Sequence, residues 1–192
     1  MNIQAVNMVS QNNNVSFQSK LIPTKYLKDL LDAGIKNPVG QSEVVDGIRR
    51  IVSDGRDDVV RIDYPKSKFV NWIFPGAYKV SVNDQTRGWN YHFSGGGINV
   101  QGRFALEEVY MNEYGQIKLP KVTSIMEESK PTLFRKRIDA NWRRLFDEYD
   151  YNGADPKKIK NIKKNMEFLK KRYSMVVQEE LIKIKKEFFP EG

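Results

Sequence analysis

Hydrophobic positions along the chain change their period twice. They recur every three or four residues between positions 21 and 55, every second residue between 58 and 119, and every three or four residues again after Pro120. A period near 3.6 is typical of a helix packed on one face, and a period of two is typical of a half-buried strand. The pattern therefore predicts an α+β fold in which a central sheet is preceded and followed by helices.

The first helical segment predicts two short N-terminal helices. Pro23 and Thr24 begin the first, and Gly34 is placed to close it in a left-handed cap. Ser42 is the expected N-cap of the second, and Gly55 stands where a C-terminal glycine belongs. Both apolar stripes are expected to pack on the core; they comprise Tyr26, Leu27, Leu30 and Leu31, and then Val44, Val45, Ile48, Ile51 and Val52.

The alternating segment predicts an antiparallel meander of about five strands. The first three apolar runs are Val60, Ile62 and Tyr64, then Tyr78, Val80 and Val82, then Trp89, Tyr91 and Phe93. Residues 83–88 form the turn of a hairpin, and one sheet face is expected to bury Trp89, Tyr91 and Phe93. Ile98, Val100, Phe104 and Leu106 continue the alternation with Gly102 as a candidate bulge, and residues 112–115 suggest a further hairpin.

Two long helices are predicted after Pro120. The first begins near Pro131 and is expected to place Phe134, Ile138, Trp142, Leu145, Phe146 and Tyr149 on one face. Asp155 followed by Pro156 is an N-cap and first-turn proline, and the apolar series after it predicts one helix from Pro156 to Glu187. This helix would be about 48 Å long at 1.5 Å per residue. Because the connection is short, the two helices are expected to form an antiparallel hairpin.

These segments divide the 192 residues into three zones. Residues 1–20 are rich in Asn, Gln and Ser and predict a flexible polar leader. Residues 21–120 are expected to form the α+β domain, and residues 121–192 the helical hairpin packed on it or projecting from it. Val15, Phe17 and Leu21 alternate with polar residues, so the end of the leader alternatively adds an edge strand to the sheet.

Composition restricts the class of protein. There is no cysteine, which excludes disulfides, thiolate nucleophiles and cysteine-based zinc sites. The longest uncharged stretch, Phe69 to Tyr78, is too short to cross a bilayer, so no membrane span is expected. The N-terminus lacks the basic and apolar regions of a conventional secretory signal, which favours a cytoplasmic protein, with unconventional export left open.

Positive charge is concentrated in the C-terminal third. Residues 130–192 hold 17 Lys and Arg against 10 Asp and Glu, so they account for +7 of the net charge of +8. The last predicted helix carries eleven of these cations: Lys157, Lys158, Lys160, Lys163, Lys164, Lys170, Lys171, Arg172, Lys183, Lys185 and Lys186. Since the apolar stripe occupies one face, the lysines are expected to form a ridge over the others.

This ridge predicts non-catalytic binding to an anionic macromolecule, through phosphate-backbone contact with nucleic acid or through attraction to another polyanion. Lysine dominance argues against base-specific readout, and no aromatic platform is expected on the ridge, which disfavours a single-strand binder. The alternatives are a solvated helix face and attachment to a membrane surface.

A protein partner or a second copy of the chain is the other predicted ligand. A helix of about 48 Å extends beyond a 20-residue neighbour of about 30 Å, which would leave part of the apolar stripe of the longer helix uncovered. The residues concerned are Val177, Leu181, Ile184, Phe188 and Phe189. Alternatively, the first two helices or the sheet cover this end.

The runner-up function is a small metal-independent ribonuclease or toxin-like enzyme. His92 is the only histidine, and Arg103 and Glu107 would share a sheet face with it if strand order brings them together. No motif indicates a cofactor or metal, because the triplet Gly95, Gly96 and Gly97 lacks the Lys-Ser/Thr of a P-loop. The sequence thus favours a binding protein and leaves the enzyme as an alternative.

Overall fold

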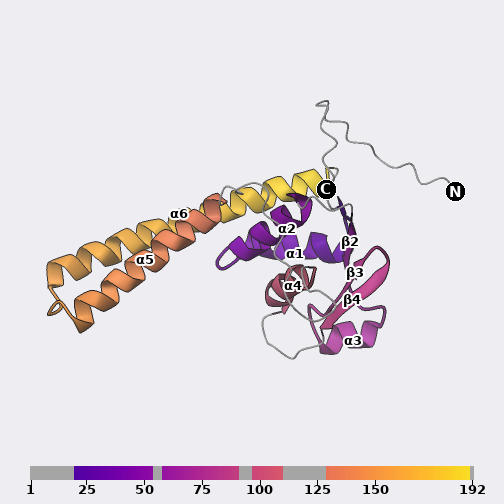
Figure 1. Cartoon of the computed structure of the whole chain (residues 1–192), viewed down its shortest axis with the longest axis horizontal. Coiled ribbons are helices and arrows are strands. Elements are labelled where there is room, and N and C mark those ends of the chain that lie inside the picture. The colour runs from indigo at the N-terminus through magenta and orange to yellow at the C-terminus, as the bar shows by residue number, and fades with distance from the viewer. Residues whose placement is uncertain (1–19, 54–57, 91–96, 110–128, 191–192) are drawn as a thin grey trace.

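The computed structural model describes residues 20–53, 58–90, 97–109 and 129–190, and the side chains of residues 87–90 are not included in this description. Within these ranges the fold is mixed α+β, with six helices and a four-stranded sheet (Figure 1). In chain order the elements are β1 (Lys20–Leu21), α1 (Lys25–Lys36), α2 (Ser42–Ser53), β2 (Val59–Asp63), α3 (Lys68–Ile73), β3 (Tyr78–Val82), β4 (Gln85–Asn90), α4 (Gly97–Glu108), α5 (Lys130–Asp150) and α6 (Pro156–Phe188).

The sheet has the order β1-β2-β3-β4 and is mixed. Strand β1 pairs with β2 in parallel, whereas β2 with β3 and β3 with β4 are antiparallel. The expected all-antiparallel meander of about five strands is therefore wrong in strand number and in the direction of β1. Leu21 does extend the sheet as an edge strand by pairing with Val60, while Val15 and Phe17 lie outside the described residues.

The hairpin between β3 and β4 is confirmed, with a tighter turn than predicted. Only Asn83 and Asp84 separate the strands, and both have positive φ, 49° and 63°. Two successive left-handed residues are typical of a type I′ turn, and Asn and Asp are the non-glycine residues that tolerate this conformation best. The predicted burial of Trp89, Tyr91 and Phe93 concerns side chains outside the described part of the structure.

Residues 97–108 form helix α4, so the strand predicted over Ile98 to Leu106 is wrong. The buried residues explain the error, because they recur at helical spacing: Gln101, Gly102, Ala105, Leu106 and Val109. Gly102 is accordingly a site of close helix packing and not a bulge. The short helix α3, capped by Ser67, was not predicted, and the hairpin expected at residues 112–115 lies outside the described ranges.

Helices α1 and α2 are confirmed, and the predicted stripes are buried except for the partly exposed Val52. Two residues predicted to mark the ends of these helices have other roles in the structure. Gly34 lies inside α1, where a β-carbon would come within 2.9 Å of Cδ1 of Leu181, so the glycine permits close packing of α6. Ser42 is the first helical residue of α2 and not its cap, and Gly55 lies outside the described residues.

The core forms where α1, α2 and α4 meet the sheet and the C-terminal half of α6. Figure 1 shows α1 and α2 between α6 on one side and α4 on the other. Val177, Leu181 and Ile184 of α6 are fully buried there, and Phe188 and Phe189 pack partly buried against the core. The uncovered stripe proposed for a protein partner is therefore wrong for this end of α6, and the alternative in which the first two helices cover it is confirmed.

The long C-terminal helices are confirmed, and α6 extends one residue beyond its predicted end. The hairpin is correct in part: α5 runs antiparallel to the first half of α6 only, since the second half of α6 belongs to the core (Figure 1). Among the described helices, none combines the length and apolar character needed to span a bilayer.

Candidate nucleic-acid interface

Residues 136–172, which comprise most of α5 and the first half of α6, project from the rest of the molecule and are called the arm (Figure 1). Its two helices meet along a seam of buried side chains: Ile138, Leu145, Met166 and Leu169. Within the seam, Asn165 Nδ2 donates to Asn141 Oδ1 at 3.0 Å, so the one buried amide on α5 is paired across the interface. The arm is thus a two-helix structure with a narrow apolar contact.

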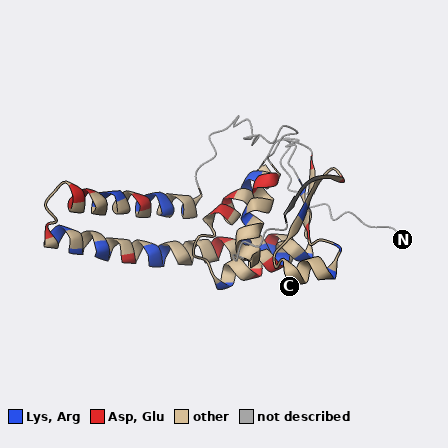
Figure 2. Cartoon of the chain, turned by 90° about the horizontal axis from the view of Figure 1, so that it is seen from below, with Lys and Arg blue, Asp and Glu red and all other residues tan. Residues whose placement is uncertain are grey.

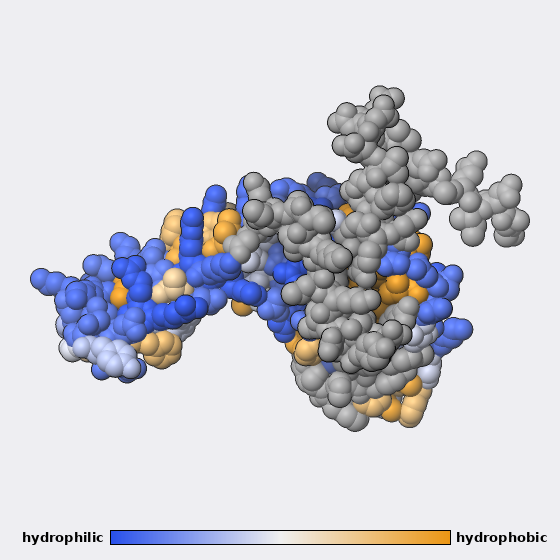
Figure 3. Space-filling view, viewed as in Figure 1, coloured by the Kyte–Doolittle hydropathy of each residue, from blue (hydrophilic) through white to orange (hydrophobic). Residues whose placement is uncertain are grey.

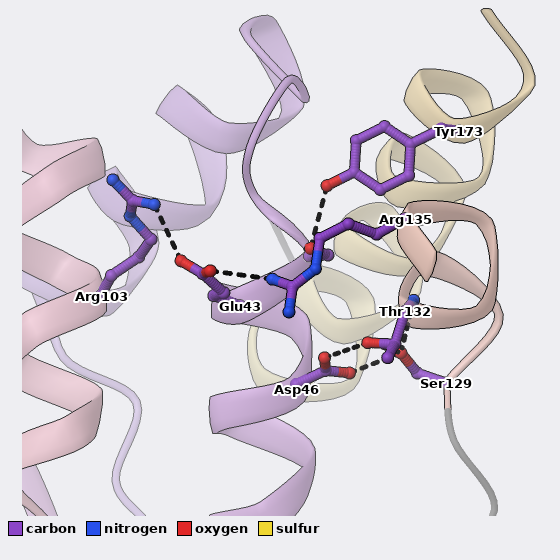
Figure 4. Close-up of polar contacts among 8 residues, drawn as sticks. Glu43, Asp46, Arg103, Ser129, Thr132, Arg135 and Tyr173 are labelled. Carbon is purple, nitrogen blue, oxygen red and sulfur yellow. Dashed lines mark hydrogen bonds and ion pairs between the residues drawn. The ribbon is translucent and has the colours of Figure 1, made fainter. Parts of the chain in front are cut away.

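The base of the arm is joined to α2 by polar contacts (Figure 4). The Tyr173 hydroxyl of α6 donates to Ser42 Oγ at 2.9 Å. The hydroxyls of Ser129 and Thr132, at the start of α5, both donate to the Asp46 carboxylate. These contacts connect both arm helices to the same face of α2.

A third connection at the base involves Glu43 of α2. Its carboxylate pairs with Arg135 of α5 and with Arg103 of α4, each at 2.8 Å (Figure 4). The side chains are 30 to 44% exposed, so water screens both pairs and each contributes modestly to stability. Together they link Glu43 of α2 to α4 and to the first part of α5.

Charge is distributed unequally between the arm and the rest of the chain. The arm holds 12 Lys and Arg and 6 Asp and Glu, whereas the other 155 residues hold 20 and 18. Figure 2 shows Lys and Arg along the arm part of α6. The arm is therefore a cationic projection from a part of the molecule that is close to neutral.

The eleven predicted ridge cations fall into two groups. Eight lie on the arm, from Lys157 to Arg172, and all eight are exposed. The remaining three, Lys183, Lys185 and Lys186, lie beside the core, where Lys183 pairs with Glu180 at 2.7 Å and Lys185 with Asp32 at 2.6 Å. The hydrogen bond to Glu180 raises the pKa of Lys183. The arm group is therefore the larger exposed set, and among its eight described members Lys158 alone makes an ion pair.

Partners within the arm are few. Lys158 pairs with Glu148 at 3.5 Å. In the described ranges, Lys157, Lys160, Lys164 and Lys171 make no ion pair. Their ammonium groups are available to an anionic ligand without first breaking an internal contact.

Three aromatic residues of the predicted apolar face of α5 lie largely at the surface. Trp142, Phe146 and Tyr149 of α5 are 40, 60 and 49% exposed. The Trp142 and Phe146 rings stack with centroids 6.1 Å apart. Aromatic rings therefore lie beside the lysines, although the sequence predicts no aromatic platform on the ridge.

Two lysines of α6 lie over these rings. Lys170 Nζ is 5.1 Å from the centroid of the Trp142 ring, and Lys163 Nζ is 5.9 Å from that of Tyr149. Cation–π contacts at exposed sites are worth about 0.5–1 kcal/mol, less than the stacking of one base on an aromatic side chain at about 1–3 kcal/mol. A ligand that offers both a phosphate and a base can therefore displace these contacts.

Two of the three predicted catalytic residues lie on a helix and not on a strand. Arg103 and Glu107 lie four residues apart on helix α4, and Arg103 is paired with Glu43. His92 lies outside the described residues. Burial and the neighbouring Glu107 raise the pKa of Glu108, which shows that α4 places a carboxyl group in an unfavourable position for its charge.

A shallow depression lies near the tip of the arm, lined by Arg144, Asp147, Glu148, Asn152, Lys158, Asn161 and Ile162. Its lining combines two acidic with two basic side chains, so it favours neither sign of ligand. In the described ranges, no group of His, Asp and Glu side chains is arranged to hold a metal ion.

No protein-family model, curated protein or solved structure matches this chain.

Proposed function

We propose that the protein is a non-catalytic binding protein whose arm engages the phosphate backbone of nucleic acid. The observation that carries this proposal is the set of exposed, unpaired lysines on a projection from a nearly neutral body. Lysines that neutralise phosphates release condensed counterions, which drives association. Surface charges interact over about 8 Å at physiological salt, so acidic residues beside the core screen the arm only near its base.

The arrangement of the cations favours binding that is independent of sequence. The four unpaired lysines recur at intervals of three, four and seven residues, so they lie on one side of α6, away from the seam, and form a ridge without a pocket: Lys157, Lys160, Lys164 and Lys171. A lysine contributes a point charge and not the bidentate pattern with which arginine reads guanine. The ligand is therefore expected to be recognised through its backbone.

Salt-dependent binding tests the proposal. Fluorescence anisotropy with a labelled duplex of about 30 bp and mixed sequence, measured from about 50 to 200 mM KCl, should show affinity falling steeply with salt. Replacing Lys157, Lys160, Lys164 and Lys171 by Gln should weaken binding. The slope of log K against log salt should become shallower by about 0.9 for each phosphate that the variant no longer neutralises.

The matched control removes the same charge from the rest of the molecule. Lys25, Lys36, Lys66 and Lys68 are exposed and lie outside the arm, so their replacement by Gln lowers the net charge by an equal amount. This variant should retain most of the affinity. Equal decreases in affinity for both variants, or wild-type binding indifferent to salt, would remove the arm as the binding surface.

The alternative of a metal-independent ribonuclease stays a prediction. It requires that His92 act with Arg103 and Glu107, and replacement of His92 by Ala should then abolish any ribonuclease activity of the purified protein. Unchanged activity would reject this role.

A further inference from the structure

We infer that the arm binds single-stranded nucleic acid through one face, formed by Trp142, Phe146 and Tyr149 of α5 and by Lys163 and Lys170 of α6. We call this the aromatic–lysine face. The inference rests on the proposed function and adds to it the strandedness of the ligand and the surface that holds it.

The aromatic rings form a row along one side of α5. They occupy positions i, i+4 and i+7, which lie on the same side of a helix and here span about 10 Å along its axis. The seam between the helices is filled by Ile138, Leu145, Met166 and Leu169, so these rings border it and remain 40 to 60% exposed. Ring surface not used in packing is thereby available to a ligand.

Cations accompany the rings at both ends of the row. Lys170 lies over Trp142 and Lys163 over Tyr149, from the neighbouring helix. In the described ranges, neither ammonium group has a carboxylate partner. A phosphate can thus bind the ammonium group while a base stacks on the ring. One face therefore offers both a cation for the backbone and an aromatic surface for the bases of a single strand.

This combination distinguishes single strands from duplexes. Bases in a duplex have both flat faces stacked on neighbouring bases, so they cannot lie on a protein side chain. A single strand exposes these faces, and every base has one, so stacking is tolerant of sequence. That tolerance agrees with a surface whose charges are mostly lysine.

The neighbours of the row argue against a membrane surface as the ligand. Arg143, Asp147 and Asp150 follow the aromatic residues in sequence and are exposed and charged. Figure 3 shows an arm that is mainly hydrophilic, with separate apolar patches. Interfacial helices instead present a broad apolar face that inserts below the lipid headgroups.

Two labelled probes test the inference with the full chain: a mixed-sequence single strand of about 20 nucleotides and the duplex of the same sequence. Replacement of Phe146 or Tyr149 by Ala should raise the single-strand Kd about tenfold and change the duplex Kd less than about twofold. Phe146→Leu keeps the apolar volume without the ring and should weaken single-strand binding similarly. Single-strand binding should also quench the fluorescence of Trp142, and Trp142→Phe should remove that quenching.

Phe168→Ala is the matched control, because Phe168 is 67% exposed on the arm and lies outside the aromatic–lysine face. It should leave both affinities unchanged. Aromatic replacements that leave single-strand binding intact, or weaken duplex binding equally, would overturn the inference while the proposed function stands. Failure of the wild type to bind either probe would overturn both proposals, and capture only by vesicles containing phosphatidylserine would identify a membrane ligand instead.

Discussion

Gly102 of α4 lies so close to Leu30 of α1 that a β-carbon at this position would come within 2.4 Å of the leucine Cδ1. The Cδ2 and Cγ atoms of Leu30 would be 2.6 and 3.0 Å away, so its whole side chain would have to move. Leu30 is fully buried, and the surrounding core leaves it no free space. Glycine at residue 102 therefore determines how closely α1 and α4 pack.

Gly102→Ala should destabilise the protein. Alanine gains about 1 kcal/mol over glycine in a helix interior, but overpacking of a core typically costs about 1–3 kcal/mol. Because the entire Leu30 side chain is displaced, we expect a net decrease in stability, read as a lower midpoint of urea unfolding. Gly34→Ala is the comparison, since only one atom, Leu181 Cδ1 at 2.9 Å, is crowded there. An unchanged midpoint for Gly102→Ala would contradict this packing.

The hydrogen bond from Tyr173 to Ser42 should stabilise the base of the arm. Both side chains are buried, so the bond is shielded from water. Tyr173→Phe and Ser42→Ala, with the double variant, should give a coupling free energy of about 0.5–1.5 kcal/mol in chemical unfolding. Strictly additive single effects would show that the bond contributes nothing.

Loss of Asp46 should loosen the first turn of α5. Its carboxylate accepts hydrogen bonds from Ser129, the N-cap of this helix, and from Thr132. In Asp46→Ala, amide hydrogen exchange should accelerate near Thr132 and remain unchanged at the seam residue Leu145. The control is Asp139→Ala, which removes an exposed carboxylate from the arm itself. Equal exchange near Thr132 in both variants would exclude this role for Asp46.

Glu108 should make stability depend on pH. Burial, followed by the neighbouring Glu107, raises its pKa above the ordinary 4.5, so the fold favours the protonated carboxyl group. Its contribution to stability is present below pH 4.5 and is lost as the pH rises through the raised pKa. Glu108→Gln should therefore raise the thermal midpoint at about pH 7 and leave it nearly unchanged at about pH 3.5. A gain of equal size at both pH values would reject this explanation.

Elements with local signals were predictable from the sequence. Asp155 and Pro156 begin α6, and Asp155 accepts from Lys157 N at 2.9 Å as an N-cap should. Whether residues 97–108 form a strand or a helix was not predictable in the same way. Ile98 and Val100 fit an alternating pattern, while Ala105 and Leu106 fit a helical one. Burial against α1 and α2 decides between them, and that burial depends on residues distant in sequence.

The candidate site was predictable in its charge and not in its aromatic surface. The lysines of α6 follow directly from composition. Trp142 and Phe146 are exposed because α6 is the helix that packs along this part of α5. One helix covers a narrow strip of its neighbour, whereas the apolar stripe of α5 is wider. A stripe broader than one neighbour can cover is the sequence signal that would have identified these rings.

Helix α6 runs without a break from the tip of the arm into the core, where Val177, Leu181 and Ile184 are fully buried. Swinging the arm would require bending this helix or withdrawing these side chains from their neighbours. The free energy that stabilises the fold therefore also holds the arm in one orientation. A ligand bound near the tip is thereby held at a fixed distance and direction from the sheet.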